Sequence, residues 1–141
     1  GLYTHRVMNR KEPLVRGFDD YFVAPHSRHT TIPKEAIRAC KDLKVMAESD
    51  EAGVFLCMAE NGKKIFVMGH PEYDRLTLGK EYRRDKDKGL DIRVPKNYFP
   101  NDDDTERPSL IWRAHANTLY TNWLNYYVYQ LTPYVWEDDK E

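Results

Sequence analysis

Residues 43–69 read LKVMAESDEAGVFLCMAENGKKIFVMG, and three short apolar runs in this stretch decide the fold. The runs at 43–49, 53–60 and 63–69 have the length and composition of β-strands. Asn61-Gly62 is typical of a type I′ turn, so the second and third runs are predicted to form a hairpin. The third run is mostly apolar, which predicts a buried strand. This region is therefore expected to supply a β-sheet.

On the N-terminal side of this region, the sequence predicts one more strand and one helix. Residues 1–15 are polar and mixed, which indicates a poor strand or an arm. Apolar and aromatic residues at 18–23 predict a short strand before Pro25. Pro33 suits the first turn of a helix, whose apolar face would hold Ala36, Ile37 and Cys40.

On the C-terminal side, two helices flank a long loop. A helix is predicted from about 72 to 87, with Leu76, Gly79 and Tyr82 inward. Three prolines and three consecutive Asp predict an irregular loop at 90–108, of a length that is usually functional or packed over something. Ser109 is expected to cap a helix from 110 to about 130, after which 135–141 form an acidic, frayed tail. The inward stripe of that helix comprises Trp112, Ala116, Leu119, Trp123 and Tyr127.

Composition excludes several classes of protein. The 141 residues suit one domain, and an aromatic content of 13% argues against general disorder. With 22 basic and 23 acidic side chains, the chain lacks the basic excess of a nucleic-acid binder. No apolar stretch approaches the length of a membrane span. Two cysteines make no disulfide framework, so a cytoplasmic location is expected.

His70-Pro71-Glu72 follows directly on the third apolar run. A strand-to-helix turn places side chains in the crevice above a sheet, where open α/β folds hold their sites. A histidine there can act as a general base, and a carboxylate two residues later can fix its tautomer. The alternative is structural: His70 caps the following helix, and Glu72 complements the helix dipole.

Other candidate residues give weaker local signals. His26 and His29 have a metal-ligand spacing but lack further ligands, and Ser27 lacks the glycine-flanked elbow of a nucleophile. Cys40 and Cys57 both fall at apolar positions and indicate small core residues. Arginines 83 and 84 could grip a carboxylate, or they could form surface pairs such as Arg84 with Asp85. The aromatic residues of the last helix indicate core or a subunit interface.

Taken together, several segments resemble the C-terminal half of bacterial homoserine O-acyltransferases. The resemblance covers almost the whole chain, in order and at family-like spacing. The segments are RGFDD (16–20), APHSR (24–28), GHPEYD (69–74), NYFP (97–100), NWLNYYVYQ (122–130) and TPY (132–134).

The resemblance implies a fold, a reaction and four site residues. The fold is α/β, the C-terminal half of a flavodoxin-like domain similar to class I glutamine amidotransferases. The reaction is ping-pong transfer from acyl-CoA to L-homoserine by a Cys-His-Glu set, in methionine biosynthesis. His70 matches the base, Glu72 the orienting carboxylate, and Ser27 and Arg84 the substrate-contacting residues. No metal or bound cofactor is implied; acyl-CoA is a substrate, acetyl being favoured over succinyl, and members are usually homodimers.

One departure from the family pattern is large. The family's nucleophilic cysteine belongs to an N-terminal half that these 141 residues do not include, and neither Cys40 nor Cys57 matches it. The chain is therefore expected to be the C-terminal half of one acyltransferase domain, inactive alone. Two alternatives remain open: a Cys-His-Glu hydrolase or amidotransferase of the same fold, and a non-catalytic interaction module.

Overall fold

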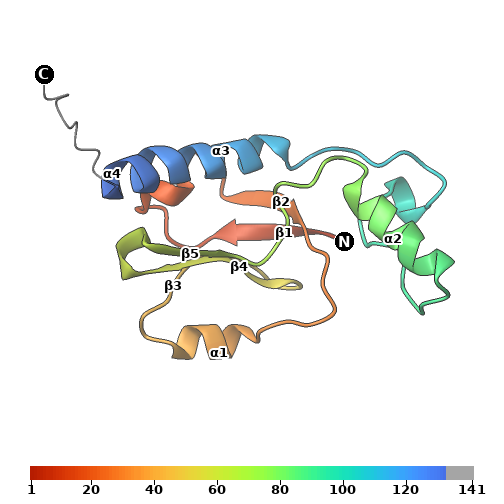
Figure 1. The fold of residues 1–141 in the computed structure, drawn as a ribbon, viewed down its shortest axis with the longest axis horizontal. Coiled ribbons are helices and arrows are strands. Elements are labelled where there is room, and N and C mark those ends of the chain that lie inside the picture. The colour runs from red at the N-terminus through yellow and green to blue at the C-terminus, as the bar shows by residue number, and fades with distance from the viewer. Residues whose placement is uncertain (133–141) are drawn as a thin grey trace, which may run out of the picture.

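Residues 1–132 are described by the computed structural model, and five of their segments form one antiparallel sheet (Figure 1). The strand order is β2-β1-β3-β4-β5, and all four pairings are antiparallel. An α/β fold is confirmed, whereas the described strands contain no parallel pair that would identify a flavodoxin-like sheet. The strands are β1 (Leu2–Val7), β2 (Tyr21–Pro25), β3 (Lys44–Ser49), β4 (Gly53–Ala59) and β5 (Lys64–Val67).

The stretch 43–69 does supply three strands, but the last of them is an edge. Strand β4 is buried from Val54 to Met58, because it lies between β3 and β5. The prediction of a buried β5 was wrong: Phe66 is 41% exposed and Val67 37% exposed. Strand β5 ends the sheet among the described residues, so its apolar composition does not secure burial.

The hairpin between β4 and β5 is longer than the predicted two-residue turn. Ala59 pairs with Lys64, which leaves residues 60–63 as the connection. Glu60, Asn61 and Gly62 all have positive φ. An ion pair between Glu60 and Lys64 closes the turn. The Asn-Gly signal located the turn correctly but not its type.

The first residues of the chain form strand β1, which is the first of the two predicted alternatives, a poor strand or an arm. Strand β1 lies between β2 and β3, and its buried side chains are Leu2 on one face and His5 and Val7 on the other. The alternation of polar and apolar residues was hidden because one inward position is a histidine. A histidine is rarely fully buried, and His5 is 0% exposed.

Helices cover both faces of the sheet (Figure 1). The C-terminal helical segment crosses one face, α1 lies against the other, and α2 lies beyond one end of the strands. No helix in the described range is both long enough and apolar enough to cross a membrane. The helices are α1 (Lys34–Ala39), α2 (Thr77–Asp87), α3 (Arg113–Trp123), the π-helical turn Leu124–Val128, and α4 (Tyr129–Leu131).

Two predicted helices have different bounds in the structure. Helix α2 begins at Thr77 rather than near 72, because residues 71–76 form turns. Leu76 is therefore outside the helix and exposed, while Gly79 and Tyr82 are buried as predicted. Helix α1 ends before Cys40, which is exposed instead of lying in the core.

The last helix begins three residues later than predicted, at Arg113, and Ser109 does not cap it. Four of the five predicted inward residues are buried, but Trp123 is 41% exposed. Asn122 is buried in its place and donates hydrogen bonds to the carbonyl oxygens of Leu14 and Arg16. The π-helical turn after Trp123 changes the phase of the stripe, so Tyr127 again faces inward. The predicted tail at 135–141 lies outside the described residues.

Two of the apolar clusters pack the helices on either side of the turn after β5. One joins the sheet to α3, and the other packs α2 against the irregular segment 90–108 around the buried Trp112. That segment contains one short 3-10 turn, Pro100–Asp102, and contributes Tyr98 and Phe99 to the second cluster. The prediction of an irregular loop packed over something is confirmed.

Candidate active site

His70 and Glu72 meet in the turn that leaves β5. Nδ1 of His70 lies 2.8 Å from Oε1 of Glu72, and both side chains are partly exposed. The His70 N–H donates to the Pro25 carbonyl oxygen, which fixes the turn to the end of β2. A side chain at Gly69 would meet that same oxygen at 2.8 Å, so only glycine allows this approach. The turn precedes α2 by several residues, so the helix-capping interpretation of His70 was wrong.

The imidazole of His70 is held on its face as well as at its edge. The ring of Tyr73 stacks on it, with centroids 4.3 Å apart and planes 15° apart. Tyr73 is anchored in turn, because its carbonyl oxygen accepts a hydrogen bond from Nε1 of the buried Trp112. Among the described residues, Nε2 of His70 has no hydrogen-bond partner. This is the nitrogen that a base presents to the proton it takes.

One carboxylate joins Tyr73 to Ser27. The Tyr73 hydroxyl donates to Oε1 of Glu81, and the Ser27 hydroxyl donates to Oε2, both at 2.7 Å. Burial and this carboxylate raise the pKa of Tyr73 to about 12, so its hydroxyl remains a donor at neutral pH. Sequence reasoning missed Glu81 because it lies 54 residues from Ser27, and no local pattern links the two.

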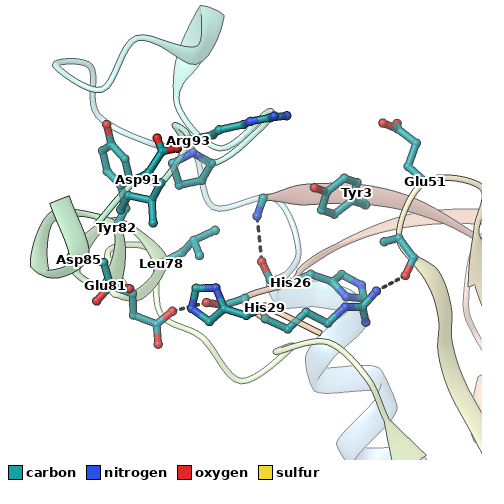
Figure 2. A pocket seen from close by; sticks show the side chains of 16 residues that line it. Tyr3, His26, His29, Glu51, Leu78, Glu81, Tyr82, Asp85, Asp91 and Arg93 are labelled. Carbon is teal, nitrogen blue, oxygen red and sulfur yellow. Dashed lines mark hydrogen bonds between the residues drawn. The ribbon is translucent and has the colours of Figure 1, made fainter. Parts of the chain in front are cut away.

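A polar cavity of about 410 Å³ opens next to this carboxylate (Figure 2). Helix α2 forms one wall, with Leu78, Glu81 and Asp85, and the ends of β1 and β2 form another. Asp91 and Arg93 approach from the irregular segment. Side chains of both charges line the cavity, which suits a small zwitterionic molecule.

The structure does not place the four predicted site residues in one cavity. Ser27 lines it, whereas His70 and Glu72 do not; His70 is connected to it through Tyr73, which binds the lining residue Glu81. Arg84 is outside the lining residues, because its guanidinium binds the Asp85 carboxylate with two hydrogen bonds, at 2.7 and 3.0 Å. The surface-pair interpretation of Arg84 thus describes this structure, and a carboxylate ligand would have to replace Asp85.

The other nucleophile and metal candidates gain no support. Cys57 is buried in β4, and burial raises the pKa of its thiol, which disfavours the reactive thiolate. His26 and His29 point to different surroundings, one buried and one exposed. Within residues 1–132, no group of three or more metal-ligating side chains comes together.

The residue before Ser27, His26, forms a buried pair with His5. Nε2 of His5 and Nε2 of His26 are 2.9 Å apart, and the side chains are 0% and 4% exposed. One imidazole must donate and the other accept, so the two rings cannot both be protonated. Burial lowers the pKa of His5 to about 4, and burial with the neighbouring His5 lowers that of His26 to about 3. Sequence analysis treated His26 only as a metal candidate.

This pair should make the stability of the fold depend on pH. In the unfolded chain both histidines titrate near 6.5, so the unfolded state binds more protons as pH falls below that value. Stability is therefore complete above pH 6.5 and decreases toward pH 4, by on the order of 1 kcal/mol per pH unit for each histidine. We expect urea unfolding of the intact protein to show this loss between pH 7 and pH 5.

The matched control for this experiment is the exposed His29. His29→Asn should leave the pH dependence unchanged, whereas His5→Phe, which keeps a ring beside Phe22 and Phe55, should weaken it. An equal pH dependence in wild type and in His5→Phe would show that the pair is not responsible.

The geometry defines a class of site. A histidine with a carboxylate on Nδ1 and an unpartnered Nε2 is an arrangement typical of general acid–base sites. A model of the homoserine O-succinyltransferase family matches residues 1–134, and the chain belongs to this family.

Curated relatives agree with the family. The chain is 66% identical over 134 residues to a homoserine O-acetyltransferase of Lachnoclostridium phytofermentans, covering 95% of this chain and 44% of that protein. It is 64% identical over all 141 residues to one of Agathobacter rectalis, covering 46% of that protein. A third, of Clostridium acetobutylicum, is 55% identical over 134 residues, covering 95% of this chain and 44% of that protein. The chain thus spans less than half the length of these relatives.

Proposed function

We propose that the intact protein transfers an acyl group from acyl-CoA to the hydroxyl of L-homoserine, and that this chain supplies the general base. The observation that carries the proposal is the His70–Glu72 pair, which contacts Tyr73 and through it Glu81, a residue of the cavity wall. Membership of the family supplies the reaction class. The acetyl group is the favoured donor because the similar relatives are named acetyltransferases.

The chemistry follows a ping-pong course. His70 takes the proton of a cysteine thiol, and the thiolate attacks the thioester carbonyl. Coenzyme A leaves as its thiol after taking up a proton, and the acyl group remains on the cysteine as a thioester. His70 then takes the proton of the homoserine hydroxyl, which attacks this thioester and releases the cysteine. Glu72 holds the tautomer in which Nδ1 carries the proton and Nε2 is unprotonated. It also stabilises the imidazolium that forms in each step.

The nucleophilic cysteine belongs to the part of the protein that these 141 residues do not cover. The relatives are about twice as long as this chain, and Cys57 is buried within the sheet. The remaining part of the protein would bind along strand β5. The outer edge of β5 is unpaired within the described residues, and its apolar side chains are exposed. An apolar groove of about 350 Å³ continues this surface between β5 and α3. The completed sheet would be the flavodoxin-like one.

The remaining features of the proposal concern assembly and surroundings. Exposed apolar side chains on the last helical turns, Leu124, Tyr129 and Leu131, suit contact with a second subunit. The mechanism needs a reduced thiol, which a cytoplasmic location supplies. It uses no metal or bound cofactor.

Arg84 is proposed to bind the carboxylate of homoserine. The substrate carboxylate would then replace that of Asp85 on the Arg84 guanidinium. Arg84→Ala should raise the KM for homoserine by roughly 10- to 100-fold, because a charge-assisted bidentate pair is lost. The KM for acyl-CoA should change little. Steady-state kinetics of the intact protein with each substrate varied will measure both.

The neighbouring Arg83 provides the control for this variant. Arg83 packs over Phe99 and bonds the Asp104 carbonyl oxygen instead of Asp85. Arg83→Ala should keep the KM for homoserine within about threefold. Equal effects of the two substitutions would remove Arg84 from the substrate site.

The proposed function is tested by assaying the intact protein with two donors and two acceptors. We expect an O-acylhomoserine from homoserine, faster with acetyl-CoA than with succinyl-CoA. Glutamine hydrolysis without acyl transfer would favour the amidotransferase alternative. No turnover of any of these substrates, in a folded intact protein, would favour the non-catalytic interaction module.

A further inference from the structure

The turn after β5 contains a residue that contacts both the base and the wall of the cavity. Tyr73 presents the face of its ring to His70, at 4.3 Å, and its hydroxyl to Glu81, at 2.7 Å. Tyr73 lies three residues after His70, so the same short turn positions both side chains. Its N–H donates to the His70 carbonyl oxygen at 3.2 Å. The two ends of one side chain thus touch two parts of the site.

The ring contact restricts the imidazole in a direction that Glu72 leaves open. A single hydrogen bond at Nδ1 allows the imidazole to rotate about that bond and swing Nε2 away from its target. A stacked ring removes this freedom, because rotation would force the two planes out of contact. The side chain of His70 is 36% exposed, so little else among the described residues confines it.

The hydroxyl contact restricts the carboxylate that faces the cavity. Glu81 receives one hydrogen bond on each oxygen, from Tyr73 and from Ser27. Without the Tyr73 hydroxyl, the carboxylate keeps a single donor and can turn on its side chain. Tyr73 itself cannot move freely, because Trp112, which is 1% exposed, holds its carbonyl oxygen.

We propose that Tyr73 is a positioning residue with two separable parts: its ring orients the His70 imidazole, and its hydroxyl sets Glu81 in the wall of the homoserine cavity. This inference rests on the proposed function and deepens it. It separates orientation of the base from the shape of the acceptor cavity, because the ring acts on proton transfer in both half-reactions and the hydroxyl acts on the acceptor cavity alone.

Two substitutions in the intact protein separate the two parts. Tyr73→Phe keeps the ring and loses the hydroxyl, so acylation by acetyl-CoA should stay within about threefold while the KM for homoserine rises roughly tenfold. Tyr73→Leu loses both, so acylation should also fall by about 10- to 100-fold, the cost of a misplaced reacting group. Single-turnover acylation and steady-state KM are the two measurements.

The control is Tyr126→Phe, in the helical turn after α3, which loses a hydrogen bond with Arg16. It should change neither quantity, since Tyr126 contacts neither His70 nor Glu81. A spectroscopic readout is independent of activity: the His70 ring protons should show an upfield ring-current shift in wild type and in Tyr73→Phe.

The outcomes distinguish this inference from the proposed function. A wild type without acyl transfer to homoserine rejects the function, while the ring-proton shift still reports the stacking. An active wild type with unchanged acylation in Tyr73→Leu overturns the role of the ring. If Tyr73→Leu does not fold, Tyr73→Phe decides alone: slower acylation in that variant, or an unchanged KM for homoserine, overturns the inference.

Discussion

His70→Ala should abolish acyl transfer by the intact protein, with both half-reactions slowed by about 10²- to 10⁴-fold. The reason is that, in the proposed mechanism, one imidazole serves both steps: it takes the proton of the thiol first and that of the homoserine hydroxyl second. Nε2 is the only nitrogen of His70 available for this, since Glu72 lies on Nδ1 at 2.8 Å. Rapid-quench measurement of acyl-enzyme, with and without homoserine, will separate the two steps.

The control for this variant is His115→Gln. His115 lies on α3 and pairs with Asp19, far along the chain from the turn after β5. This substitution should leave both rates near those of wild type. Acyl-enzyme formation at the normal rate in His70→Ala would show that another group is the base. Glu72→Gln should give a smaller loss, because it weakens the hold on the tautomer without removing the base.

Trp112→Ala should cost about 3–5 kcal/mol in the free energy of unfolding of the intact protein. Trp112 is 1% exposed and lies at the centre of the cluster that joins α2 to the irregular segment. The substitution leaves a cavity and frees the Tyr73 carbonyl oxygen from its hydrogen bond. Urea unfolding measures the loss, and activity should fall with it, because the turn that carries His70 loses its anchor.

Trp123→Ala is the matched comparison, since Trp123 is the last residue of the helix that Trp112 precedes but is 41% exposed. The free energy of unfolding should change by less than about 1 kcal/mol there. Similar losses in both variants would contradict the assignment of Trp112 to the core and Trp123 to the surface.

Local patterns predicted the parts of the fold that depend on neighbours in sequence. The apolar runs of β3 and β4 and the turn that brings His70 to Glu72 follow from short-range geometry, and the structure confirms them. Strand β1 was predicted only as a poor strand or an arm, because its buried His5 looks polar. Only the partner His26, 21 residues away, makes burial of that imidazole possible.

The part of the site outside the turn also depends on contacts between residues distant in sequence, so local patterns could not predict it. Glu81 and Ser27 are joined by a hydrogen bond between segments distant in sequence. Ser27 and Arg84 were predicted from the family resemblance alone, and the structure brings only Ser27 to the cavity. The exposure of β5 was missed because apolar composition indicates burial without saying which part of the protein provides it.

The central claim is that this chain is the base-bearing half of a ping-pong acyltransferase. Intact-protein mass spectrometry, after incubation with acetyl-CoA and without homoserine, tests it most directly. We expect the addition of one acetyl group, on a cysteine outside residues 1–141, and its loss as O-acetylhomoserine when homoserine is added. Formation of O-acetylhomoserine with no acetylated protein at any time, or acetylation of Cys40 or Cys57, would contradict the account.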